Sequence, residues 1–279
     1  MRLLNMLKLN LLGSGGATPY SERTTPMAVL TIGNASLLFD CGSGACLRLA
    51  QARTRPSNIE AIFLTHFHAD HCVDLPLILL SSYLDGRQRP IRLYGPDGLK
   101  SYVQAINNLY SYIPTLVRNV TGVEFQLEIT ELDGGESVSD ESWCVTAARA
   151  RHGVPALGYR ISTENATVVL SGDTEPSDDI VAIARGAQVL VHDCSFPDSI
   201  GEAPGHTLPR DLGVVAKRAG VKALVLTHLF QEVLGHEQEI HDSIAKNYDG
   251  KIVFGTDLLE VIVDGEAITF NPLWRPSYM

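Results

Sequence analysis

Three histidines and one aspartate lie within six consecutive positions of this chain, at His66, His68, Asp70 and His71. Imidazole and carboxylate groups are ligands that zinc and related metals bind well. The apolar residues 61–64 before them predict a short buried strand, and residues 74–84 after them predict a helix. In the turn between these elements, the two alternate histidines can converge on one ion, while the Asp70–His71 pair can reach a second ion beside it. This spacing, which a merely histidine-rich surface loop rarely has, predicts a site for two metal ions.

Other histidines and aspartates follow apolar, strand-like runs later in the chain, at His152, Asp173, His192, Asp193 and His228. Functional side chains gather where strand ends converge, because the sheets hold the backbone there while the side chains point into a common cleft. A lone histidine or aspartate after a strand is more often a cap or a surface group. The first motif is what favours a shared metal site at this edge.

The contiguous motif resembles the His-x-His-x-Asp-His signature of the metallo-β-lactamase superfamily. The resemblance covers most of the chain through short segments at residues 12–19, 40–44, 94–96, 158–160, 171–174 and 227–228. Within the superfamily, the chain is most similar to ribonuclease Z and its arylsulfatase-like and phosphodiesterase relatives. This resemblance implies a four-layer αββα fold of the α/β class, with two mixed β-sheets between helices, whereas periodicity alone indicates only mixed α/β.

The resemblance also implies how seven ligands divide between two zinc ions: His66, His68 and His152 on the first, Asp70, His71 and His228 on the second, and Asp173 as the bridge. Five imidazoles and two carboxylates suit zinc, and manganese, iron or cobalt can occupy such a site in vitro. Some redox relatives have Glu in place of His68 and support di-iron chemistry, so His68 favours hydrolysis. Two zinc ions about 3.5–4 Å apart can share a bridging water and lower its pKa towards neutrality.

Asp193 and His206 resemble the ribonuclease Z pattern in which an acidic residue orients a second histidine near the leaving group, although the family more usually has Glu at the first position. A carboxylate-oriented imidazole can donate a proton to a poor leaving group, which phosphodiesters have and activated β-lactams need less. His206 as a mere loop residue before a helix is the alternative. We take Asp70, Asp193 and His206 as candidate catalytic residues and expect phosphodiester hydrolysis.

The surface charge and one short connection limit the expected substrates. The net charge of −10 over 279 residues provides no general attraction to nucleic acid or anionic lipid. Only twelve residues separate Arg160 from Asp173, where relatives that bind tRNA carry a long arm. We therefore expect a small or single-ended phosphodiester, with an arylsulfate, lactone or other ester as alternatives. A non-hydrolytic metal-binding or biosynthetic-accessory protein is a further possibility of another class.

Arginines cluster locally at Arg53 and Arg55, at Arg87, Arg89 and Arg92, and at Arg149 and Arg151. We interpret each cluster as a solvated face. Five cysteines, an odd number, argue against a disulfide framework, and Cys72 and Cys194 need no role beside the site. No apolar run approaches the ~20 residues needed to cross a bilayer, and residues 1–12 indicate a first strand and not a signal peptide. We expect a cytoplasmic protein, and the family resemblance suggests a homodimer.

No linker or composition shift divides residues 1–279, which predicts one domain. Strands are predicted at 7–12, 28–32, 36–39, 61–64, 123–130, 143–148, 157–161, 167–170, 188–191, 223–226, 251–254, 260–263 and 267–270. Helices are predicted at 45–52, 74–84, 178–185, 208–219 and 236–246, and residues 97–107 and 109–117 are expected to be helix or loop.

Overall fold

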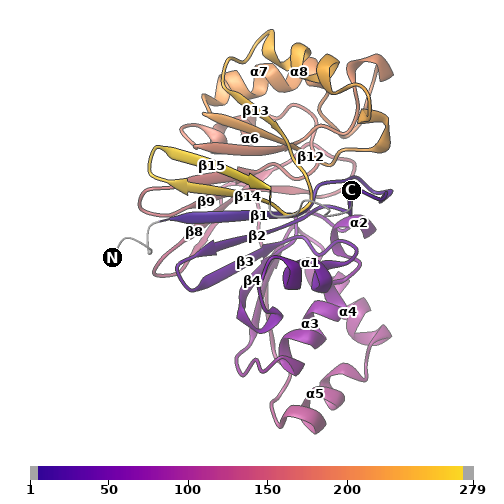
Figure 1. Ribbon diagram of the computed structural model, residues 1–279. Coiled ribbons are helices and arrows are strands. Elements are labelled where there is room, and N and C mark those ends of the chain that lie inside the picture. The colour runs from indigo at the N-terminus through magenta and orange to yellow at the C-terminus, as the bar shows by residue number, and fades with distance from the viewer. Residues whose placement is uncertain (1–5, 273–279) are drawn as a thin grey trace, which may run out of the picture.

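Two mixed β-sheets lie face to face in the computed structural model, which describes residues 6–272 (Figure 1). The first sheet contains, in spatial order, β15 (Ala267–Pro272), β14 (Leu259–Asp264), β1 (Leu7–Gly13), β2 (Met27–Ile32), β3 (Ala35–Phe39), β4 (Ile59–Phe63), β5 (Ile91–Gly95) and β6 (Leu127–Glu131). The second contains β13 (Lys251–Phe254), β12 (Ala223–Thr227), β11 (Val189–Asp193), β10 (Thr167–Leu170), β9 (Leu157–Ser162), β8 (Cys144–Arg149) and β7 (Ser137–Ser139).

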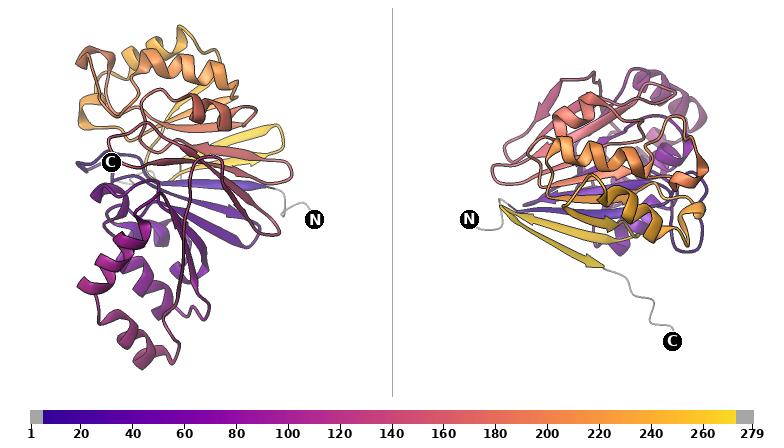
Figure 2. Two further views of the ribbon diagram at one scale, coloured as in Figure 1. Left: turned by 180° about the vertical axis from the view of Figure 1, so that it is seen from behind. Right: turned by 90° about the horizontal axis from the view of Figure 1, so that it is seen from above.

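Helices cover the outer face of each sheet. Those on the first sheet are α1 (Ala45–Gln51), α3 (Leu75–Leu84), α4 (Leu99–Leu109) and α5 (Ile113–Thr121), and those on the second are α6 (Asp178–Ala184), α7 (Pro209–Ala219) and α8 (Glu237–Ala245). The view from behind in Figure 2 shows the two groups of helices on opposite sides of the paired sheets. The predicted four-layer αββα architecture is confirmed.

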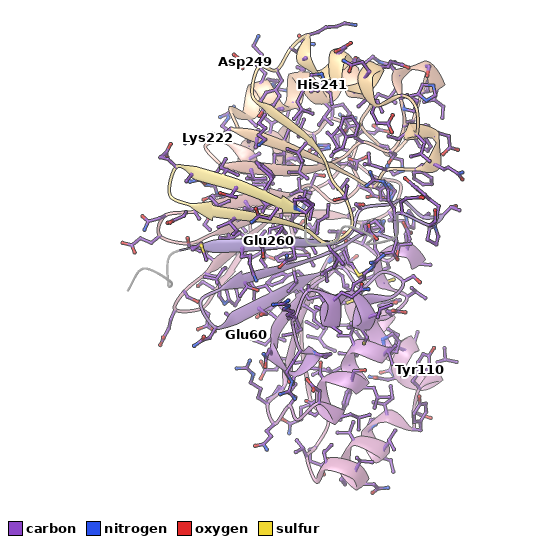
Figure 3. All side chains as sticks on the ribbon, in the orientation of Figure 1. Glu60, Tyr110, Lys222, His241, Asp249 and Glu260 are labelled. Atoms are coloured by element: carbon purple, nitrogen blue, oxygen red, sulfur yellow. The ribbon has the colours of Figure 1, made fainter. Side chains whose placement is uncertain are left out.

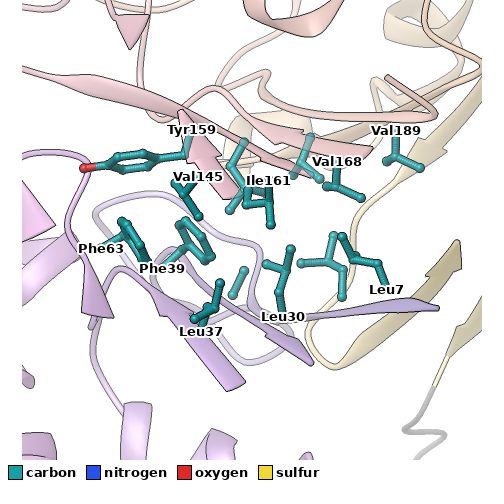
Figure 4. Packing of buried hydrophobic residues seen from close by; sticks show 14 of the residues in the cluster. Leu7, Leu30, Leu37, Phe39, Phe63, Val145, Tyr159, Ile161, Val168 and Val189 are labelled. Carbon is teal, nitrogen blue, oxygen red and sulfur yellow. The ribbon is translucent and has the colours of Figure 1, made fainter. Parts of the chain in front are cut away.

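The side chains between the two sheets are almost all apolar and fully buried (Figure 4). Alternation along β1 places Leu7, Leu9 and Leu11 in this central layer. Phe63 stacks on Phe39 with 5.0 Å between ring centroids and meets Tyr159 of the opposite sheet edge-on at 5.4 Å. The Tyr159 hydroxyl donates to the Leu64 carbonyl at 2.6 Å, which joins the sheets two residues before the histidine motif begins.

The strand directions bring several chain segments to one edge of the molecule. β10, β11, β12 and β13 are parallel, and β8 runs in the same direction because both β8 and β10 pair with β9 antiparallel. In the other sheet, β3, β4, β5 and β6 are parallel. The loops that follow the carboxyl ends of these strands can therefore meet.

Strands β5 and β7 were not predicted, and β6 begins at Leu127, four residues later than expected. β5 contains Arg92, and a charged residue obscures a buried strand in the sequence. The structure pairs this arginine with Glu60 of the adjacent β4, labelled in Figure 3, and with Asp140 at 3.0 Å. A cross-strand partner thus makes a charged side chain compatible with a mostly buried strand. Both uncertain segments before β6 are helical, as α4 and α5.

Arg87 corrects the interpretation of its cluster as a solvated face. Its side chain is 3% exposed, and its guanidinium donates to the carbonyls of Arg89 at 2.8 Å, Pro90 at 2.6 Å and Ile59. Burial lowers the pKa of Arg87 to about 10, which leaves it charged at neutral pH. The side chain holds the turn after α3 against the start of β4, so its role is structural.

We expect Arg87→Met to lower the free energy of unfolding by about 3 kcal/mol, because buried carbonyls lose their donor while the apolar stem is kept. Urea unfolding followed by far-UV circular dichroism measures this loss. The exposed neighbour Arg89 provides the matched control, and Arg89→Met should change the free energy by no more than about 0.5 kcal/mol. Equal effects of the two substitutions would contradict the structural role of Arg87.

All five cysteines carry free thiols, as expected without a disulfide framework. Among residues 6–272, no helix has both the length and the apolar character that spanning a bilayer requires. The homodimer, the cytoplasmic location and the single domain stay predictions.

Candidate metal centre

The seven predicted ligands converge at the edge where the strands end. His66 and His68 lie in the connection between β4 and the short helix α2 (Ala69–Cys72), whereas Asp70 and His71 lie on α2 itself and not in the turn. The three distant ligands, His152, Asp173 and His228, follow β8, β10 and β12, respectively. Residues separated by up to 162 positions are thus brought together by the strand directions.

One triad consists of three histidines with facing ring nitrogens. His68 Nδ1 lies 3.0 Å from His66 Nε2 and 3.2 Å from His152 Nε2. In a tetrahedral zinc site with the usual zinc–nitrogen distances, ligand atoms are about 3.3 Å apart. The triad therefore fits a single zinc ion, and it is the set predicted for the first metal.

The second triad combines a carboxylate and two histidines. Asp70 Oδ2 lies 3.4 Å from His71 Nε2 and 3.4 Å from His228 Nε2. Asp173 lies between the two triads, with its Oδ2 3.1 Å from His228 Nε2, 3.3 Å from His71 Nε2 and 3.9 Å from His66 Nε2. A carboxylate in this position can serve two ions at once, as expected for Asp173.

The other ring nitrogen of four of these histidines is held by a protein group. His66 Nδ1 contacts Thr65 Oγ1 at 3.0 Å, His71 Nδ1 contacts Asp40 Oδ2 at 2.8 Å, His152 Nδ1 contacts the Gly205 carbonyl at 2.8 Å, and His228 Nδ1 contacts Ser195 Oγ at 2.9 Å. Metal-binding histidines are normally oriented by such a contact, which fixes the tautomer. The Nε2 atoms are thereby directed into the cluster, and buried His71 Nε2 has no hydrogen-bond partner there. These features fit a divalent metal.

Asp40, Thr65 and Ser195 are functional candidates that the sequence did not reveal as such. Buried Asp40 accepts hydrogen bonds from the Thr65 backbone N–H at 2.8 Å and from the Thr65 hydroxyl, in addition to its contact with His71. Its position directly after β3 is the same strand-end signal that the predicted residues carry. Ser195 had no comparable signal beyond its closeness to Asp193.

Without bound metal, the charges of the cluster balance one another. Burial disfavours charge on His228, but the Asp173 carboxylate outweighs it and raises the pKa of His228 to about 9. Burial is likewise outweighed at His71, where Asp173 and Asp40 raise the pKa well above its ordinary value. Burial and the neighbouring His71 lower the pKa of His66 to about 2. His66 is therefore neutral and ready to bind a metal, whereas His71 and His228 of the second triad hold protons.

Asp193 and His206 lie beside the second triad. The fully buried Asp193 carboxylate contacts His206 Nδ1 at 3.1 Å through Oδ2, so the shorter aspartate does reach the histidine. The His206 ring stacks on that of His228 with centroids 5.1 Å apart. A ring nitrogen of His206 also lies within 4.8 Å of ligand atoms of Asp173 and His228, so a role as metal ligand is geometrically possible.

His192 lies at the same edge but is separate from the ligand cluster. Its buried Nδ1 lies 2.9 Å from the Asp193 carbonyl oxygen and 3.2 Å from Asp193 Oδ1. Its contacts are therefore with the carboxylate that holds His206.

The model of the β-lactamase superfamily domain matches residues 36–229 of this chain. Ribonuclease Z from Methanosarcina mazei is 28% identical over 310 aligned positions, which cover 92% of this chain and 98% of that protein. The crystal structure of the metallo-β-lactamase fold protein YhfI from Bacillus subtilis gives a TM-score of 0.79 at 21% identity, covering 93% of this chain and 100% of that one. The crystal structure of the short form of human tRNase Z gives a TM-score of 0.72 at 25% identity, covering 91% of this chain and 98% of that one.

With its two-sheet fold and its match over most of its length, the chain belongs to the β-lactamase superfamily. Its similarity to ribonuclease Z places it in the ribonuclease Z-like branch, as the motif predicted. The chain is accordingly a hydrolytic enzyme.

Metal uptake should release about two protons per chain near pH 7.5, because His71 and His228 must become neutral before they can coordinate. Calorimetric titration of the metal-free protein in buffers of different ionisation enthalpy measures this number. Since the pKa of His228 is about 9, the release should decline as the pH rises through 9. The raised pKa of His228 also stabilises the folded, metal-free protein. This stabilisation is fully present at pH values below 6.5, the pKa of the unfolded chain, and is lost as the pH rises through 9. Metal uptake without proton release would contradict the charge state of the second triad.

Proposed function

We propose that this protein is a dinuclear zinc phosphodiesterase that acts on small or single-ended substrates. The observation that supports it most directly is the pair of triads sharing Asp173, with the Asp193–His206 pair beside them. His66, His68 and His152 would hold one ion, and Asp70, His71 and His228 the other. Manganese, iron or cobalt could replace zinc in vitro, because the same ligands accept them.

Two bound zinc ions would supply a nucleophile at neutral pH and stabilise charge on the attacking and departing oxygens. The protein's own contribution is to orient the ligand rings and to handle the proton of the departing group. Asp70 is both a ligand and one of the acidic groups facing the reaction centre. His206, with Nδ1 held by buried Asp193, can present its other nitrogen to the departing oxygen.

Three observations support the restriction to small substrates. The M. mazei alignment is longer than this chain of 279 residues, so that relative contains residues with no counterpart here. β9 is joined to β10 by a turn of four residues, 163–166, where a projecting arm would have to be inserted. The net charge of −10 also opposes binding of a large polyanion.

Three probes separate this proposal from its alternatives. We expect the zinc-loaded protein to cleave bis-p-nitrophenyl phosphate faster than p-nitrophenyl sulfate or a simple lactone. A preference for the sulfate or the lactone would assign the site to an arylsulfatase or lactonase. Failure with all three probes by a protein holding two metal ions would contradict the proposed phosphodiesterase activity. Low-nanomolar binding of a tRNA precursor at physiological salt, measured by gel shift, would contradict the restriction to small substrates.

A further inference from the structure

Arg151 lies at an open pocket that adjoins the metal cluster. The pocket has a volume of about 660 Å³, and its lining includes His68, His152 and His206 together with Arg151 and Glu175. It therefore lies next to both the first triad and the histidine proposed to protonate the departing group. Arg151 is the residue that contributes a guanidinium to the lining of this pocket.

The backbone of Arg151 is fixed relative to the metal ligands. Its N–H donates to Thr174 Oγ1 at 2.9 Å, and its carbonyl accepts from the Glu175 N–H at 2.8 Å. Thr174 directly follows the bridging Asp173, and Arg151 directly precedes the ligand His152. The backbone from which the guanidinium extends is therefore fixed both by its neighbour His152 and by the segment that follows Asp173.

The side chain itself is only weakly engaged. It is 66% exposed, its Nη2 lies 3.8 Å from Glu175 Oε2, and its Nη1 lies 3.4 Å from the Pro176 carbonyl. Exposed ion pairs at such distances contribute little to stability. The arrangement therefore leaves the donors of the guanidinium available to a ligand.

Glu175 is the acidic residue next to this guanidinium. Its Oε1 accepts from the Gly205 N–H at 3.1 Å, which anchors the carboxylate on the loop that carries His206. Its Oε2 lies 3.8 Å from Arg151 Nη2, so the anchored carboxylate is next to the guanidinium at the pocket. An incoming phosphate binds a guanidinium through two parallel hydrogen bonds, which the 3.8 Å contact with Glu175 does not provide.

We propose that Arg151 selects substrates that carry a second phosphate on the departing group, next to the diester that is cleaved. This inference rests on the proposed phosphodiesterase function and refines its substrate class to nucleotides with a terminal phosphate. The pocket joins Arg151 to His206, so the second phosphate lies on the side where the departing oxygen is protonated. Arg151 acts on specificity through substrate binding and takes no part in bond cleavage.

Thymidine dinucleotides test this assignment. Product analysis of TpT cleavage identifies the departing nucleoside, and TpTp or pTpT then places a terminal phosphate on that nucleoside or on the other one. We expect the isomer with the phosphate on the departing nucleoside to have a kcat/KM about 10- to 100-fold above that of TpT, mainly through KM. Arg151→Gln should reduce this ratio to about one. A ratio near one in the wild type, or a high ratio that survives the substitution, would overturn the proposal.

Arg149→Gln is the matched control, because Arg149 has the same 66% exposure but pairs with Asp133, and it does not line this pocket. It should keep the wild-type ratio. Binding of thymidine 3′,5′-bisphosphate relative to thymidine 5′-monophosphate provides a second readout that requires no turnover. The zinc-loaded wild type should prefer the bisphosphate about 10-fold or more, and Arg151→Gln should not. If no diester is cleaved, the proposed function fails while this binding ratio still decides the role of Arg151.

Discussion

Asp173→Ala is expected to remove metal and activity together, with kcat/KM for bis-p-nitrophenyl phosphate falling at least about 10³-fold. The Asp173 carboxylate lies within 3.9 Å of nitrogens from both triads, so its loss should weaken the binding of both ions. It also removes the charge that balances His71 and His228 in the metal-free protein. Elemental analysis should show a fall from about two zinc ions per chain to less than one.

Asp178→Ala is the control for this substitution, because that carboxylate is 84% exposed on α6 and pairs with Arg218 away from the cluster. It should retain metal and activity. Asp173→Asn keeps the shape of the side chain and tests whether the loss arises from misfolding, since it should bind less zinc while its circular dichroism spectrum stays native. Full metal content and activity in both Asp173 variants would show that the site lies elsewhere.

The cluster of candidate ligands was largely predictable because each of these residues has a local signal. Four of the candidates lie within six consecutive positions, and the others each follow an apolar run whose end can be read from the sequence. Because β10, β11 and β12 are parallel, their carboxyl ends lie at the same edge of the sheet. Strand periodicity and residue type locate the strand ends, whereas the strand directions are a property of the fold and the division into two triads came from the family resemblance.

The groups that orient the ligands were harder to predict because their roles exist only in the folded chain. Asp40 lies 31 positions before His71, and Ser195 lies 33 positions before His228. Asp40 has a strand-end position and Ser195 has no comparable signal, but in both cases only the contact in the folded chain identifies which histidine the residue orients. Gly205 illustrates the same limit: its φ of 80° and the 2.8 Å that would separate an added Cβ from His152 Nδ1 explain why glycine lies there.

The elements that were missed share a different cause. β7 has only three residues, too few to establish a period, and Arg92 interrupts the apolar run of the short strand β5, so neither segment has a strong strand signal. Their pairing with β8 and with β4 and β6 supplies the stability that local sequence does not indicate. Arg87 was misinterpreted for a related reason, since its acceptors are backbone carbonyls that have no sequence signature.

His206→Ala is expected to lower kcat by a factor that depends on the leaving group of the substrate. General acid catalysis is worth about 10²–10⁴ in rate when the departing oxygen needs a proton in the transition state. We therefore expect kcat to fall by about that factor for a nucleoside leaving group, such as that of TpT. The fall should be much smaller for bis-p-nitrophenyl phosphate, because p-nitrophenolate departs as a stable anion.

Two further measurements separate a general acid from a metal ligand. Zinc content in His206→Ala should stay at the wild-type value if Asp193 holds the ring for proton donation, whereas loss of zinc would make His206 a ligand beside Asp173 and His228. Asp193→Asn should show the same dependence on the leaving group more weakly, since the imidazole remains and only its orientation and charge environment change. Equal losses on both kinds of substrate would show that His206 supports the structure of the site and does not donate the proton.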